Sequence, residues 1–314
     1  MSVPLGIALP DGLPLRDAVE ICVEAERLGY SDVWSYEVAG HDAFTPLAAI
    51  AARTERLRLG TAVVPASTRP PALLAMTSAA LQNLSGGRFC LGLGTSTTTI
   101  VNRWMGLPTR IGLDHMRRTI QAIRAIAAGD KVNGFRLEAG ASPLPIYVGA
   151  LGLRMVELAG EIAQGAVWAN GSRSHMAVSL RHLPEPARND PGFFIGNMVP
   201  TCIDDDRAAA AAVMRRTLAS YVRLPNYQNY WIEAGYEEEM LAIRAALARG
   251  ETQRVPELLS DRWLRDVTLF GSVKDVRDGV EAWLATGVRT LIVVASSTRG
   301  GQMVALEELI QAFR

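Results

Sequence analysis

Short apolar runs of strand length alternate with segments of helical periodicity along this 314-residue chain. The runs are continuously apolar, as is typical of strands that are buried on both faces of a parallel sheet. Parallel neighbours need a crossover between them, and the helical segments provide it. The expected strands occupy residues 3–9, 32–36, 57–64, 88–93, 146–148, 165–168, 193–202 and 290–295. Eight strands that alternate with helices predict an α/β fold, the (β/α)8 TIM barrel.

Helix boundaries follow from start and stop signals as well as from periodicity. Leu15, Val19 and Cys22 share one face of a helix over 14–28 that Gly29 ends. Further helices are expected over 46–54, 70–84, 108–128, 151–160, 204–221 and 273–285.

The segment at about 225–266 does not fit the strand–helix repeat. It is helical in pattern and rich in Tyr, Trp and Glu, so we interpret it as an insertion between strands seven and eight that could serve as a lid. The aromatic residues in and just before it include Tyr221, Tyr227, Tyr230 and Trp231, which suit a planar or apolar substrate or simply pack the insertion onto the barrel. Because no low-complexity linker interrupts the chain, we expect one domain over 1–314.

Charge and composition exclude several classes of function. The 32 basic residues balance 32 acidic ones, so no long-range field attracts nucleic acid or an anionic membrane. No run of 18 apolar residues occurs, and the N-terminus lacks the pattern of a secretory signal, which predicts a cytoplasmic protein. Three cysteines (Cys22, Cys90, Cys202) without metal-like spacing and four scattered histidines argue against a metal site.

In a TIM barrel the active site lies at the carboxyl ends of the strands. Glu37 directly follows the second strand, where its carboxylate would project into the barrel mouth as a proton donor, a proton acceptor or an anchor for a ring. A salt bridge to an arginine at a neighbouring strand end is an equally good interpretation. The third strand ends in small residues around Ala62 and Val63, which permit the close approach of a planar ligand.

Three further strand ends carry polar or glycine-rich segments. Thr95, Ser96 and Thr97 begin a run of hydroxyl residues after the fourth strand, which suits a ring edge or a phosphate, or a plain surface loop. The fifth strand runs into a helix through the phosphate-cradle candidates Gly149, Ala150, Leu151 and Gly152. Unpaired N–H groups and the positive end of the helix dipole face the site there. The amide of Asn170 could bond a cofactor, or Asn170 could serve as a turn former.

Several characteristic sequence segments occur in the same order along the chain: Glu26–Tyr30, Thr45–Ala48, Leu59–Val63, Leu84–Phe89 and Pro145–Ala150. With them the chain resembles the bacterial luciferase-like superfamily and, within it, the coenzyme F420-dependent oxidoreductases. The resemblance implies a barrel that holds a flavin or deazaflavin ring across its mouth. It also implies a homodimer, packed through the helices that follow strands two and three.

The resemblance assigns roles to particular residues. It places a bulge with a non-prolyl cis peptide at Ala62–Val63. Ring and phosphate contacts fall on residues after strands four and five, namely Thr95, Ser96, Thr97, Gly149, Ala150, Leu151 and Gly152. Relatives commonly carry Asp-His after strand two, where this chain has Tyr36 and Glu37, which leaves the proton donor open.

We therefore expect an F420-dependent oxidoreductase that transfers a hydride between the deazaflavin and a small organic substrate of the enone or carbonyl type. The segment Gly40–Pro46 is more similar to sequences of the deazaflavin branch than to those of the flavin branch. One alternative is an FMN-dependent luciferase-like monooxygenase. Another, of a different class, is a non-catalytic flavin-binding protein that keeps the phosphate cradle but lacks a usable acid.

Overall fold

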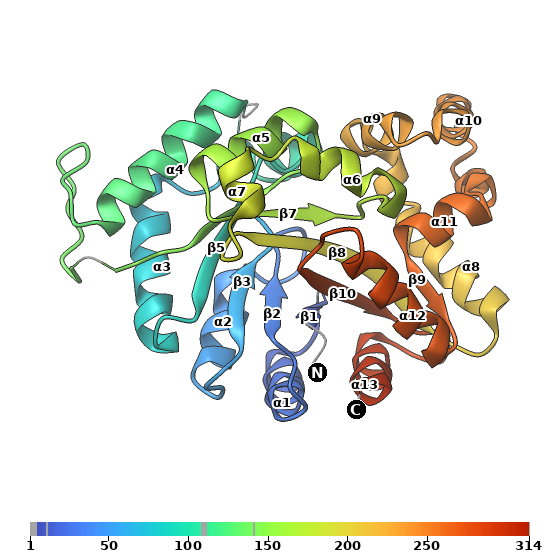
Figure 1. Cartoon of the computed structure of the whole chain (residues 1–314), viewed down its shortest axis with the longest axis horizontal. Helices are drawn as coiled ribbons and strands as arrows, with labels where there is room; N and C mark the ends of the chain where they lie inside the picture. The colour runs from blue at the N-terminus through green and yellow to red at the C-terminus, as the bar shows by residue number, and fades with distance from the viewer. Residues whose placement is uncertain (1–4, 11, 108–111, 141, 314) are drawn as a thin grey trace.

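The computed structural model describes residues 5–10, 12–107, 112–140 and 142–313. Its centre is a closed barrel of parallel strands (Figure 1). The barrel strands are β1 (Leu5–Ala8), β2 (Asp32–Ser35), β3 (Arg58–Thr61), β5 (Phe89–Gly94), β6 (Ile146–Gly149), β7 (Gly165–Ala169), β8 (Phe194–Ile203) and β10 (Thr290–Ser296). Strand β10 pairs with both β1 and β8, which closes the ring. The predicted TIM barrel is confirmed.

Helices surround the barrel on its outer face (Figure 1). They are α1 (Leu15–Arg27), α2 (Phe44–Ala51), α3 (Pro71–Ser85), α4 (Leu113–Ala127), α5 (Leu153–Ile162), α6 (Arg173–Arg181), α7 (Glu185–Asn189), α8 (Arg207–Leu218), α12 (Val273–Leu284) and α13 (Gln302–Ala312). Helices α6, α7 and α13 were not predicted. The predicted helix over 108–128 begins at Leu113 within the described residues, and 108–111 lie outside them, as do residues 3 and 4 of the predicted first strand.

The insertion is helical and lies between α8 and the last barrel strand, as predicted. It consists of η2 (Tyr221–Arg223), α9 (Pro225–Glu233), α10 (Glu237–Ala248), η3 (Thr252–Leu258) and α11 (Asp261–Val267). A short strand that the sequence did not predict, β9 (Leu269–Gly271), follows it and pairs with the end of β8. The insertion has an apolar core of its own, in which the rings of Trp231 and Trp263 meet edge to face with centroids 4.9 Å apart.

Three aromatic rings fill the barrel interior. Tyr147 and Phe194 stack with their centroids 4.7 Å apart, and the ring of Trp34 lies 5.1 Å from that of Phe194. Glycine on a neighbouring strand makes room for them, because a Cβ atom on Gly60 would lie 2.3 Å from the Trp34 ring. Since side chains plug the barrel, a ligand can bind only at its end.

Candidate functional site

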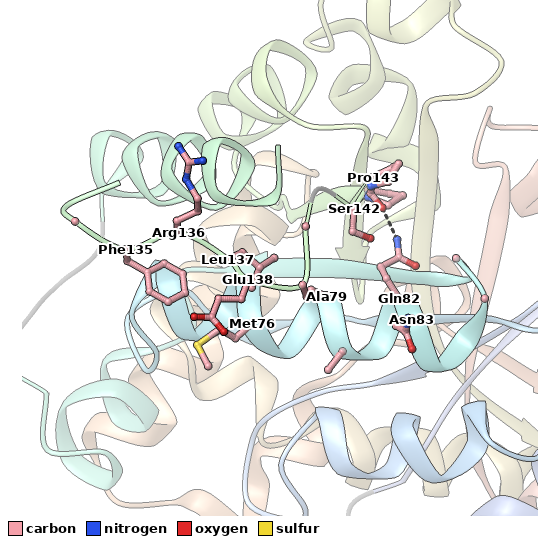
Figure 2. A pocket seen from close by; sticks show the side chains of 17 residues that line it. Met76, Ala79, Gln82, Asn83, Phe135, Arg136, Leu137, Glu138, Ser142 and Pro143 are labelled. Atoms are coloured by element: carbon pink, nitrogen blue, oxygen red, sulfur yellow. Dashed lines mark hydrogen bonds between the residues drawn. The ribbon is translucent and has the colours of Figure 1, made fainter. Parts of the chain in front are cut away.

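The described residues include two cavities large enough to hold a small molecule. The larger, about 1330 Å³, is a groove between α3 and the segment 134–145 (Figure 2). Its lining includes Gly87 and Pro145, which precede β5 and β6, so it reaches the amino ends of the strands. The other, about 430 Å³, lies at their carboxyl ends, where TIM barrels hold their active sites. We take this second cavity as the candidate active site.

The cavity brings together nine of the ten residues predicted to bind a cofactor. They are Ala62, Val63, Thr95, Ser96, Thr97, Gly149, Ala150, Leu151 and Gly152. They come from the segments that follow β3, β5 and β6, which are far apart in the chain but adjacent around the barrel. Their contact with a cofactor stays a prediction, whereas their convergence on one cavity is a property of the fold.

The cavity floor is formed where β3 ends. The peptide bond between Ala62 and Val63 is cis, as the family resemblance implied, and the chain then continues as β4 (Val64–Pro65). The hydroxyl of Thr61 bridges this irregular segment to β5, because its Oγ1 atom accepts the N–H of Gly92 and donates to the Gly92 carbonyl, both at 2.8 Å.

Glycines on the neighbouring strands let the Val63 side chain lie across the floor. A Cβ atom on Gly94 would be 2.4 Å from Cγ2 of Val63, and one on Gly149 would be 3.0 Å from Cγ1. Both positions therefore need glycine for a reason of space, since neither has the positive φ that otherwise selects it. The result is a shallow apolar surface on which a planar ring could rest.

The start of α5 forms one wall of the cavity. The first bonds inside this helix run from the N–H groups of Met155 and Val156 to the carbonyl of Gly152. The N–H groups of the preceding residues have no partner within the helix, as at any helix start. The Ala150 N–H donates to the Val167 carbonyl at 2.9 Å, so this one of the four predicted cradle amides is already paired within the barrel.

Hydroxyl groups after β5 form part of the cavity rim. Thr95, Ser96 and Thr97 are half-buried, and Ser96 adopts a left-handed backbone conformation with φ 55°. The Oγ1 atom of Thr97 accepts the N–H of Ile100 at 3.3 Å at the start of the π-helical segment η1 (Thr99–Trp104). A hydroxyl that accepts one bond still has its own hydrogen to donate, so Thr97 can also bond a ligand.

Asn170, the tenth predicted cofactor residue, lies beside the cavity and not in its lining. Its φ of 55° marks it as a turn residue, and its N–H donates to the Met198 carbonyl. Its side chain hydrogen bonds with Tyr227 of the insertion, and burial raises the pKa of Tyr227 well above the ordinary range. The turn-former interpretation thus describes its backbone, while its predicted contact with a cofactor stays untested.

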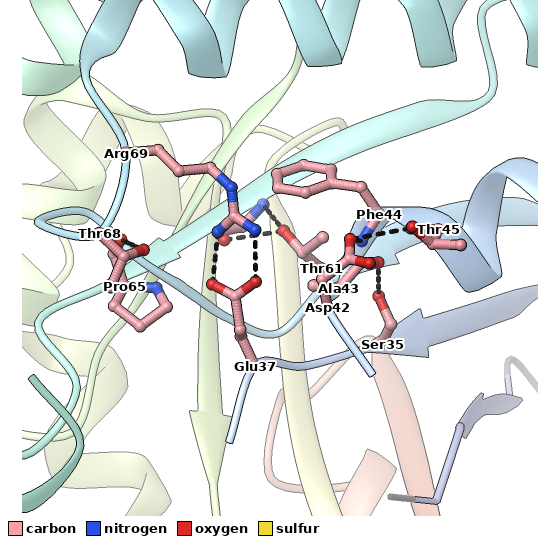
Figure 3. A network of polar contacts seen from close by, with 11 residues as sticks. Ser35, Glu37, Asp42, Ala43, Phe44, Thr45, Thr61, Pro65, Thr68 and Arg69 are labelled. Atoms are coloured by element: carbon pink, nitrogen blue, oxygen red, sulfur yellow. Dashed lines mark hydrogen bonds and ion pairs between the residues drawn. The ribbon is translucent and has the colours of Figure 1, made fainter. Parts of the chain in front are cut away.

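Glu37 forms a bidentate ion pair with Arg69 (Figure 3). The Nη1 and Nη2 atoms of Arg69 lie 2.5 and 2.7 Å from the two carboxylate oxygens of Glu37. The guanidinium also stacks over the Phe44 ring, and Glu37 is only 8% exposed. Hydrogen bonding to Glu37 raises the pKa of Arg69.

The salt bridge that the sequence left open for Glu37 is therefore present. The cavity lining does not include Glu37, although its N–H donates to the carbonyl of the floor residue Val63 at 3.3 Å. Arg69 thus holds both carboxylate oxygens of Glu37 in place. The predicted catalytic role of Glu37 stays a prediction.

One wall that the sequence analysis missed comes from the insertion. Helix α9 faces the cavity with Asn226, Asn229, Tyr230 and Glu233, together with Tyr227. The first four have the i, i+3, i+4, i+7 spacing of a single helix face. The signal was present in the sequence, but only the aromatic members were recognised. Nothing local indicated that this face would lie over the strand ends.

Two other kinds of feature are absent from the described residues. None of their helices is both long and apolar enough to cross a membrane. Within the same residues no group of three or more His, Cys, Asp or Glu side chains is placed to hold a metal ion.

Comparison with known proteins places the chain in a family. The model of the luciferase-like monooxygenase family matches residues 4–290. A Mycobacterium tuberculosis protein provisionally named a coenzyme F420-dependent oxidoreductase is 29% identical, with 95% of this chain and 96% of that protein covered. The 5,10-methylenetetrahydromethanopterin reductase of Methanolobus tindarius is 34% identical, with 91% and 92% covered.

A solved structure agrees with the fold. The coenzyme F420-dependent tetrahydromethanopterin reductase of Methanopyrus kandleri superposes with a TM-score of 0.82 at 22% identity and covers 99% of this chain and 98% of its own. The family resemblance seen in the sequence is thus confirmed. This chain belongs to the luciferase-like monooxygenase family and is similar to coenzyme F420-dependent oxidoreductases.

Proposed function

We propose that this protein is an F420-dependent oxidoreductase that transfers a hydride between the deazaflavin and a small organic substrate of the enone or carbonyl type. The observation that carries the proposal is the cavity at the strand ends, where an apolar floor, a hydroxyl rim and a helix start meet. The name of the Mycobacterium tuberculosis relative supports the same cofactor and reaction class, and the name of the Methanolobus tindarius relative, a reductase, supports the reaction class.

The residues present fit such a cofactor. A planar ring suits the flat floor around Ala62 and Val63, and its polar edge suits the hydroxyl groups of Thr95 and Thr97. A phosphate suits the start of α5, where a Cβ atom on Gly152 would meet nothing within 4 Å. When bound, the deazaflavin supplies the hydride chemistry, and the protein supplies orientation and exclusion of water.

Proton transfer is the part of the reaction for which more than one proton source is available. Glu37 is the acid that the sequence predicted, and its backbone adjoins the cavity floor. Solvent can provide the proton instead, because the cavity is open to solvent.

Titration of the purified protein with F420 and, separately, with FMN tests the cofactor. We expect saturable binding of F420. The family's description as monooxygenases favours the second candidate, an FMN-dependent monooxygenase, and binding of FMN without binding of F420 would establish it in place of our proposal. Saturable cofactor binding with no turnover of any enone or carbonyl compound would favour the non-catalytic flavin-binding alternative.

We also propose that the chain forms a homodimer through α2 and α3. Neither helix contains a charged residue, which is unusual for helices on the outside of a barrel. Leu73, Met76 and Leu84 of α3 are exposed, and Met76 also lines the groove beside the segment 134–145 (Figure 2). An uncharged apolar face of this kind is typical of protein–protein contacts, and a two-fold axis would pair it with itself.

A further inference from the structure

The wall of the active-site cavity that faces the cofactor cradle carries a single charge. Among the described residues that line the cavity, Glu233 is the only one with a charged side chain. Tyr227 and Tyr230 stay neutral, because burial raises the pKa of each well above the ordinary range. No Lys, Arg or His is present in this lining to balance the carboxylate.

Local stability does not explain a carboxylate at this position. Glu233 is the last residue of α9, where the negative end of the helix dipole disfavours an acidic side chain. It makes no ion pair with any residue in the described part of the chain. By contrast, Glu237, Glu238 and Glu239 lie in the first turn of α10, where the helix dipole favours acidic side chains.

Helix α9 holds Glu233 at a defined place over the cavity. The Tyr230 hydroxyl accepts the N–H of Ser172 at 2.9 Å, which ties the helix to the end of β7. Arg244 of α10 donates to the side chains of Gln228 and Asn229 at 2.8 and 2.7 Å. Helix α9 is therefore held by the barrel and by α10, and the exposed side chain of Glu233 extends from its last residue.

We propose that Glu233 selects substrates by charge. Its carboxylate makes the cavity favour small molecules that carry an ammonium group beside the reacting bond, tolerate neutral ones and reject those that carry a carboxylate. This inference rests on the proposed function, since it names the substrate class of the same site. It assigns substrate specificity to α9 of the insertion, whereas the residues after β3, β5 and β6 orient the cofactor.

A matched pair of probes tests the proposal without knowledge of the natural substrate. Benzylammonium and benzoate have the same ring and opposite charge, and their dissociation constants are measured by calorimetry at low ionic strength, with and without F420. We expect the wild-type protein to bind benzylammonium more tightly. The Glu233→Gln substitution should reduce the ratio of the two constants about three- to fivefold, the size of an exposed ion pair. In 0.5 M salt the two proteins should converge.

Two further variants complete the test. Glu237→Gln removes an exposed carboxylate that does not line the cavity and should leave the ratio unchanged. Glu233→Arg should reverse the preference. Absence of any preference in the wild type, or a preference that Glu233→Gln leaves intact, would overturn the proposal. Because the same samples report F420 binding, failure of the cofactor proposal would show separately as a lack of F420 affinity while the charge preference persists.

Discussion

The Cγ1 atom of Val63 lies 3.0 Å from the place that a Cβ atom would take on Gly149, so the two residues touch across the cavity floor. A methyl group on Gly149 must push Val63 away from this position. We expect Gly149→Ala to weaken F420 binding about tenfold, on the order of 1.4 kcal/mol, because the ring loses its flat support. Fluorescence titration measures this.

The matched control for that change is Gly112→Ala. Gly112 lies at the start of α4, outside the cavity, and a Cβ atom there would meet nothing within 4 Å. The affinity of the Gly112→Ala variant for F420 should equal that of the wild type. Equal affinity in Gly149→Ala as well would mean that the ring does not rest on Val63.

Arg69→Met tests the buried ion pair. The substitution leaves the Glu37 carboxylate 8% exposed and without its bidentate partner, and an unpaired buried charge is costly. We expect a loss of about 1–3 kcal/mol in the free energy of unfolding, measured by urea denaturation. Arg53→Met removes the arginine of an exposed ion pair with Glu20 and should change stability by less than about 1 kcal/mol.

Glu37→Gln separates a proton-handling role from a purely structural one. A proton donor or acceptor predicts a fall in kcat of about 10²–10⁴ with F420 affinity preserved. Because Arg69 holds both carboxylate oxygens, we expect the substitution to lower stability and to change kcat by less than about tenfold. A large loss of kcat at unchanged stability would show that Glu37 handles the proton in spite of Arg69.

Mild acid should weaken the contact that His175 of α6 makes with the insertion. Burial lowers the pKa of His175 below 6.5, while Glu233 and Asp266 oppose this in part. The unfolded chain therefore takes up the proton first as the pH falls, so this contribution to stability is present above about pH 6.5 and is lost below it.

His175→Leu should remove that dependence. The Nε2 atom of His175 is buried without a hydrogen-bond partner among the described residues, so an apolar replacement leaves no bond broken there. The melting temperature of the variant should fall less steeply than that of the wild type between pH 6.5 and 5.5. His182→Gln, an exposed neighbour, should follow the wild type, and parallel curves for all three proteins would contradict the prediction.

A charge on α3 should break the homodimer. Met76 is 47% exposed on the uncharged face, and Met76→Glu would bury a carboxylate in the proposed contact. Light scattering at micromolar concentration should give about twice 33.9 kDa for the wild type and 33.9 kDa for the variant. Leu241→Glu, at an equally exposed position on α10, should remain dimeric. A wild-type mass of 33.9 kDa would contradict the proposal itself.

Much of the barrel could be predicted because its signals are local. Apolar runs marked all eight barrel strands, and glycine or proline marked the boundaries of helices such as α1 and α3. The order of strands and helices implied the closed barrel, and closure in turn places every strand end on one face. That is why residues as far apart as Ala62 and Gly152 could be assigned to one site before the structure was considered.

The tertiary structure alone decided which side chains meet at that face. Glu37 and Arg69 are 32 residues apart, and only the path of the chain between β2 and α3 brings the guanidinium onto the carboxylate. Glu233 comes from an insertion, and no periodicity in its sequence encodes which way the insertion packs against the barrel. Its place over the cavity depends on contacts such as that of Tyr230 with Ser172, 58 residues away in the chain. Local sequence sets which elements form, whereas long-range packing sets which of their side chains share a cavity.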